Sequence, residues 1–82
     1  MAIDYSRLRS VTARRLIGAL ARDGFTLTRH TGSHQRYRHA DGRQVTVTFH
    51  HSSDTFPPKT LKTMIEDQAR WTGHDLARLG LL

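Results

Sequence analysis

The 82-residue sequence predicts a single α+β domain in which helices cover one face of a three-stranded antiparallel sheet. Three observations support this fold class. Apolar residues recur at helical spacing toward both ends of the chain, and they alternate with polar residues between about residues 25 and 50. Glycine-containing turns divide the alternating stretch into three strands. Helices flanking a run of strands are typical of an α+β fold.

The first helix is expected from about Val11 to Arg22. Its apolar residues recur three and four positions apart, while arginines occupy the other faces. Ser10 or Thr12 can cap the start of this helix, and Gly24 can take the left-handed conformation that ends it. The pattern therefore predicts an amphipathic helix with a basic outer side.

The strands follow directly. Phe25 and Leu27 alternate with threonines in the first strand, and a turn near Gly32 leads to the second, in which Tyr37 points inward. Asp41-Gly42 is a strong hairpin signal before the third strand. One face of the sheet should be apolar, and Phe25 and Tyr37 are interpreted as core residues rather than as rings that stack on bases. The opposite, polar face should carry His34, Arg36, Arg38, Thr46, Thr48 and His50.

A second helix is expected from Pro57-Pro58 to about Arg70, because proline suits the first turn of a helix. A capping box formed by Thr72 and Asp75 then predicts a short third helix that ends near Gly80. Apolar residues of this last segment either close the core or meet a partner; they are Trp71, Leu76 and Leu79.

Composition limits the possible functions. The chain has 13 Lys and Arg residues against 7 Asp and Glu, a formal net charge of +6, and eleven of the cations are arginine. The planar guanidinium binds phosphate in a bidentate manner, so a polyanionic partner is expected. An acidic protein would fit the charge equally well, and a merely solvated surface is the third alternative. So small a domain has no room for a large enclosed cavity, so the site should lie on the surface.

Other classes are disfavoured. The chain has no cysteine, which excludes disulfides and thiolate metal sites. The adjacent His50 and His51 lack the further ligand pattern of a zinc site, so no metal and no small-molecule cofactor are expected. No apolar run approaches the roughly 20 residues that span a bilayer, and no signal peptide is evident. A cytoplasmic protein without membrane contact is the resulting expectation.

Several motifs carry a resemblance to a known family. They are Asp23-Gly24-Phe25, Gly32-Ser33-His34, Tyr37, Asp41-Gly42-Arg43, Val45-Thr46-Val47, His50 and Thr60-Leu61. This set resembles the HicA (YcfA-like) family of bacterial type II toxins over about residues 11–70, and residues 71–82 form a C-terminal extension. Two departures, Thr48 in place of a common proline and Lys59 in place of a common glycine, affect the shape of the loops.

The resemblance implies a double-stranded-RNA-binding-domain-like fold and an mRNA interferase that a HicB-type antitoxin neutralises. It also places the essential catalytic histidine at His34, and the histidine that closes the third strand in the family matches His50. Whether Arg14 and Arg15 extend a phosphate track or form the antitoxin surface stays open.

The chemistry of RNA cleavage fits these residue types. The 2′-hydroxyl of the substrate can act as nucleophile, so the enzyme needs proton transfer, which suits histidine, and stabilisation of negative charge, which suits arginine. We therefore expect an endoribonuclease in which His34 is the acid or base and Arg36 or Arg38 contacts the phosphate. His50 is the candidate for a second acid or base, or else a strand-end residue without a role.

Gly32 and Ser33 complete the predicted RNA-binding residues. The main alternative is a non-catalytic RNA-binding module of the same fold, in which His34 is only a turn residue. A protein-interaction domain with a passive basic surface is the third class.

Overall fold

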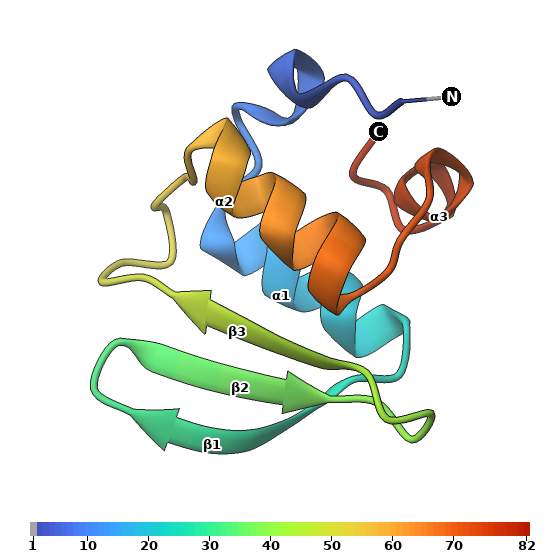
Figure 1. The fold of residues 1–82 in the computed structure, drawn as a ribbon. Coiled ribbons are helices and arrows are strands. Elements are labelled where there is room, and N and C mark those ends of the chain that lie inside the picture. Colours follow the sequence, from blue (N-terminus) through green and yellow to red (C-terminus); the bar gives the residue numbers. More distant parts are fainter. Residues whose placement is uncertain (1) are drawn as a thin grey trace.

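The computed structural model describes residues 2–82 and confirms the predicted order of helix, three strands and further helices (Figure 1). The elements are the 3₁₀ turn η1 (Tyr5–Leu8), α1 (Ala13–Arg22), β1 (Thr26–Thr31), β2 (His34–Arg38), β3 (Gln44–Thr48), α2 (Pro58–Lys62), its π-helical continuation η2 (Thr63–Gln68), and α3 (Gly73–Arg78).

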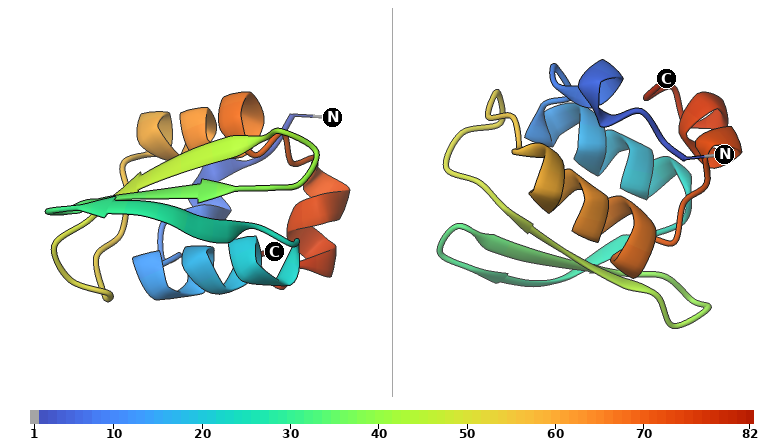
Figure 2. Two further views of the ribbon diagram at one scale, coloured as in Figure 1. Left: turned by 90° about the horizontal axis from the view of Figure 1, so that it is seen from below. Right: turned by 45° about the horizontal axis from the view of Figure 1, so that its top comes forward.

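The sheet is antiparallel in the order β1-β2-β3, and the helices lie on one of its faces (Figure 2). Side chains from α1, β3 and the α2–η2 helix form one core, in which Leu16, Leu20, Val45, Val47 and Leu61 are each less than 2% exposed. Burial of such aliphatic side chains is the main favourable term in the folding of a small domain.

The C-terminal segment closes this core. Trp71, Leu76, Leu79 and Leu81 are all buried. The apolar residues of this segment therefore close the core and do not form a surface for a partner. The predicted capping box is present: Thr72 Oγ1 accepts from the backbone N–H of Asp75, and the Asp75 carboxylate accepts from the backbone N–H of Thr72. The extension is therefore part of the folded domain.

The start of α1 fixes the loop that follows β3. Thr12 caps the helix by accepting from the backbone N–H of Arg15. The N–H groups of Ala13 and Arg14 donate to the carbonyls of Asp54 and Ser52, at 2.8 and 3.0 Å. Because the first N–H groups of a helix have no partner within it, these bonds both satisfy the helix end and hold the loop.

The structure corrects the prediction for the first strand. Leu27 is 49% exposed rather than buried, and every residue of β1 is exposed. Leu27 lies opposite Tyr37 and so shares its face, but β1 is an edge strand with only one neighbour, and the core ends at β2.

The second helix also departs from regular geometry. After Lys62 the helix widens to π-helical hydrogen bonding, in which the N–H of Ala69 donates to the carbonyl of Met64. The helix ends at Gln68, and Arg70, two residues later, is the one non-glycine residue with a positive φ (56°) among residues 2–82.

Candidate active site

The tight turn between β1 and β2 holds His34 in a fixed place. Thr31 and His34 are paired across a two-residue loop formed by Gly32 and Ser33. Gly32 has a φ of +57° and Ser33 does not have a positive φ, the pattern of a type II′ turn that requires glycine at its first central position. The carbonyl of Ser33 accepts from the N–H of Phe49 at 3.1 Å, which ties the turn to the segment after β3.

A shallow hollow of about 260 Å³ lies on the outer face of the sheet, opposite the helices. Five residues line it: Arg29, Thr31, His34, Arg36 and Thr46. His34 lies between its cross-strand partners Thr31 and Thr48, and Arg36 lies opposite Thr46. The structure thus brings His34 and Arg36 together, whereas Arg38 lies further along β2 and does not line this hollow.

Arg29 also lines this hollow, although the sequence pattern did not predict it there. Simple alternation places Arg29 on the same face as Leu27, toward the helices. A β-bulge between Leu27 and Arg29 inserts one residue, so that Arg29 lies opposite Arg36 on the outer face. Thr28 stabilises the bulge by donating from Oγ1 to the carbonyl of Arg36 at 3.2 Å. No apolar residue follows Leu27 in β1, so the sequence contains no signal of this change of phase.

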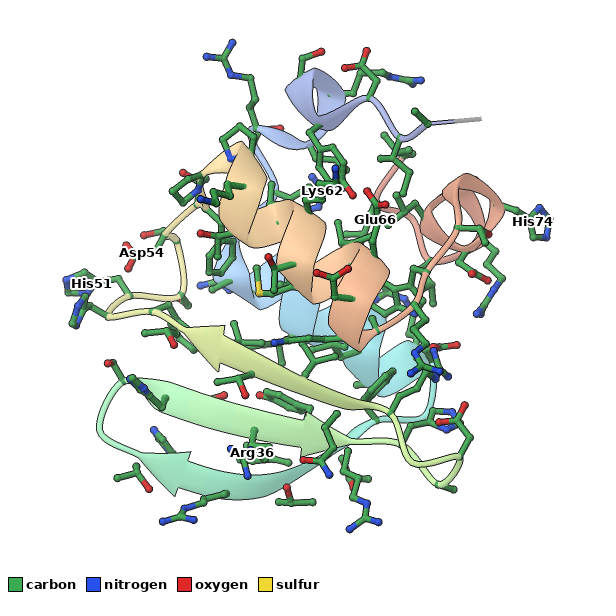
Figure 3. The ribbon with its side chains drawn as sticks, in the orientation of Figure 1. Arg36, His51, Asp54, Lys62, Glu66 and His74 are labelled. Atoms are coloured by element: carbon green, nitrogen blue, oxygen red, sulfur yellow. The ribbon has the colours of Figure 1, made fainter. Side chains whose placement is uncertain are left out.

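The hollow is positively charged. Within residues 2–82, the guanidinium groups of Arg29, Arg36 and Arg38 form no ion pair and no hydrogen bond, and no carboxylate lines the hollow. Figure 3 shows Arg36 on β2, whereas Lys62 and Glu66 belong to the helical layer. Several cations without a counterion on one face produce a field that attracts polyanions.

Arg14 and Arg15 do not belong to this surface. The guanidinium of Arg14 donates to Ser52 Oγ at 3.2 Å, and that of Arg15 donates to the carbonyl of Gly80 at 2.9 Å. These bonds attach the loop after β3 and the C-terminal segment to α1. Both arginines therefore have structural partners in the folded chain.

His50 lies next to a different hollow. This second hollow, of about 330 Å³, is lined by His30, Gly32, Ser33, Gln35, Phe49 and His50. The N–H groups of His50 and His51 both donate to Asp54 Oδ2 at 3.0 Å, and these bonds lower the pKa of the Asp54 carboxyl. The structure therefore groups Gly32 and Ser33 with His50 and separates them from the hollow that His34 and Arg36 share.

A larger hollow, of about 700 Å³, lies near η1 and α3 and contains none of the predicted site residues. There the hydroxyl of Tyr5 donates to Glu66. Burial raises the pKa of Tyr5, and the hydrogen bond and the charge of Glu66 raise it further.

Among residues 2–82, no group of three or more His, Asp or Glu side chains is arranged to hold a metal ion. None of the helices in this range has the length and apolar character needed to cross a membrane.

Comparison with known proteins gives one family. A family model described as HicA toxin of bacterial toxin-antitoxin matches residues 13–70, which covers α1, the whole sheet and the α2–η2 helix. A search of curated proteins finds no match to the chain. The matched range includes both hollows of the β1–β2 hairpin and excludes α3.

Proposed function

Because the chain belongs to the HicA toxin family of bacterial toxin–antitoxin systems, we propose that it is a metal-independent endoribonuclease that cleaves mRNA with His34 as its proton-transfer residue. The observation that supports this proposal most directly is the outer-face hollow, in which one exposed histidine lies among guanidinium groups that have no counterion. Family membership makes the chain a toxin; the nuclease mechanism is our proposal.

The proposed reaction uses the RNA itself as nucleophile. His34 takes the proton of a 2′-hydroxyl, the 2′-oxygen forms a bond to the adjacent phosphorus, and the bond from phosphorus to the 5′-oxygen breaks. The products are a 2′,3′-cyclic phosphate and a 5′-hydroxyl. Water gives its proton to the leaving 5′-oxygen, and protonated His34 passes its proton to the resulting hydroxide, which restores the neutral imidazole. Arg29 and Arg36 line the same hollow and stabilise the additional negative charge of the five-coordinate phosphorus.

The partner in the cell is proposed to be a HicB-type antitoxin. Toxin–antitoxin membership implies an antitoxin in general terms. An acidic surface on the antitoxin that covers the outer face of the sheet would neutralise Arg29, Arg36 and Arg38 and exclude RNA from His34.

The decisive experiment compares His34→Ala with His51→Ala. His51 lies in the loop after β3 (Figure 3), is exposed and lines neither hollow of the hairpin. Loss of the general base lowers the cleavage rate by about 10²- to 10⁴-fold, so His34→Ala should lose RNA cleavage and toxicity, whereas His51→Ala should keep both. Purified protein is incubated with RNA in EDTA, and folding is checked by circular dichroism. A folded His34→Ala variant that still cuts RNA contradicts the mechanism.

The same assay decides the role of His50. His50 lines the neighbouring hollow and not the one that contains His34, so His50→Ala should lower the cleavage rate much less than His34→Ala does. A loss as large as that of His34→Ala would make His50 the second acid or base. If the wild-type protein binds RNA with salt-dependent affinity but cuts none, the non-catalytic RNA-binding module replaces the nuclease.

A further inference from the structure

The second hollow of the hairpin has the components of a nucleobase site. Three of its lining residues carry aromatic side chains: Phe49, His30 and His50. The ring of His30 is held against the turn, since its Nε2 lies 3.0 Å from the carbonyl of Gly32. Single-stranded RNA is commonly bound by splayed bases that stack on aromatic side chains, histidine included.

Gln35 gives this hollow a chemical preference. The Tyr37 hydroxyl donates to Gln35 Oε1 at 2.5 Å, so the amide oxygen already has a partner. The amide Nε2 forms no hydrogen bond within residues 2–82, although the side chain is only partly exposed and lines the hollow. The N–H donors are the part of this held amide that has no partner, so they favour a ligand with an acceptor in that position.

We propose that this hollow binds the base of a nucleotide adjacent to the cleaved phosphate and selects a keto base, uracil or guanine. Uracil and guanine present a carbonyl oxygen where cytosine and adenine present an amino group. The Gln35 N–H donors can bond the carbonyl but not the amino group. This inference rests on the proposed ribonuclease function and adds a specificity-determining residue to it.

The positions of the two hollows allow one RNA strand to place a phosphate in the first and a base in the second. Ser33 lines the second hollow and its chain neighbour His34 lines the first, so both hollows lie at the Gly32–Ser33 end of the hairpin, on opposite faces of the sheet. An RNA strand that passes around this turn can therefore place a phosphate beside His34 and Arg36 on one face and a neighbouring base in the second hollow on the other face.

The test sequences the products that the protein generates from an RNA pool with all four bases at every position. The wild-type protein should show a preference of about three- to tenfold for uracil or guanine at one position next to the cut, the effect of one net hydrogen bond. Gln35→Met removes the donor and should abolish the preference. Gln35→Glu keeps an oxygen for Tyr37 and offers a second oxygen that only accepts, so the preference should change to adenine or cytosine.

Gln44→Glu is the matched control, because Gln44 is an exposed β3 residue that does not line the hollow. It introduces the same charge and should leave the base preference unchanged. A wild-type protein that cuts without any preference, or Gln35 variants that cut with the wild-type preference, would overturn the inference and leave the proposed function intact. A wild-type protein that cuts no RNA would overturn the proposed function. If Gln35→Glu fails to fold, the base preference of the wild-type protein and its loss in Gln35→Met still test the inference.

Discussion

At the scale of single residues, the arginines differ in whether their guanidinium groups have partners within the folded chain. Arg15 and Arg22 donate to carbonyls of the C-terminal segment, and Arg43 and Arg78 form ion pairs with Asp23. The arginines of the outer sheet face, Arg29, Arg36 and Arg38, have no such partners among residues 2–82. Composition alone predicted a basic protein, but only the tertiary contacts separate the guanidinium groups that have structural partners from those that have none.

This division predicts the salt dependence of RNA binding. In a His34→Ala background, which separates binding from cleavage, Arg29→Ala or Arg36→Ala should weaken RNA binding. Each should also reduce the slope of log K against log[salt] by about 0.7, the value for one phosphate contact on a single strand. Fluorescence anisotropy at several salt concentrations measures both quantities. Arg9→Ala removes the same charge from an exposed residue outside the hollow and should change the slope little.

At the scale of elements, the hydrophobic periodicity of the sequence predicted the helices and strands correctly but gave no sign of the bulge in β1. The helical and alternating patterns predicted α1, the three strands, the capping box and the exposed position of His34. The bulge in β1 was missed because it lies in a stretch of polar residues, where a shift of phase leaves no trace in the hydrophobic pattern. The consequence was local: Arg29 was not recognised as a neighbour of Arg36.

The turn that positions His34 should depend on glycine for conformational reasons alone. An added Cβ at Gly32 would meet no atom within 4 Å, yet its φ of +57° is costly for a residue with a side chain. Gly32→Ala should therefore lower the free energy of unfolding by about 1–2 kcal/mol, measured by urea denaturation, and should also reduce RNA cleavage.

Gly73 provides the comparison for this substitution. It opens α3, also has open space around an added Cβ, and does not have a positive φ. Gly73→Ala should be neutral or stabilising by up to about 1 kcal/mol, because alanine favours the helix. Equal effects of the two substitutions would contradict the role assigned to the Gly32 conformation.

At the scale of the whole molecule, one carboxylate joins three distant parts of the chain. Asp23, at the end of α1, accepts from the indole N–H of Trp71 at 2.8 Å and pairs with Arg78 at 2.7 Å and Arg43 at 3.3 Å. The Arg43 guanidinium also lies 4.9 Å from the centre of the Phe25 ring. Helix α1, the β2–β3 hairpin and the C-terminal segment therefore meet at a single anion.

The ionisation of Asp23 should be linked to stability. Burial alone would raise the pKa of this carboxyl, but the hydrogen bonds from Trp71 and Arg78 and the charges of Arg78 and Arg43 outweigh it and lower the pKa. Because the pKa is lower in the folded state, the stabilisation is fully present above the unfolded value of about 3.9 and is lost as the pH falls through the folded value.

Asp23→Asn should therefore reduce the free energy of unfolding by about 1–3 kcal/mol at neutral pH, the range for hydrogen bonds to a charged group. The difference from wild type should stay constant above about pH 5 and narrow below about pH 4. Denaturation at a series of pH values measures this, with Asp67→Asn, an exposed acid, as the control. A difference that persists undiminished at low pH would contradict the linkage.

The exposed edge strand β1 bears on how copies of the protein behave toward one another. A strand with one free edge can pair with the same edge of a second molecule, which leads to aggregation. In an antiparallel pairing of two β1 strands centred near Arg29, the two guanidinium groups would approach each other and repel. The charge proposed to hold RNA would thus also keep free copies apart, and it would do so less well once a polyanion has neutralised it.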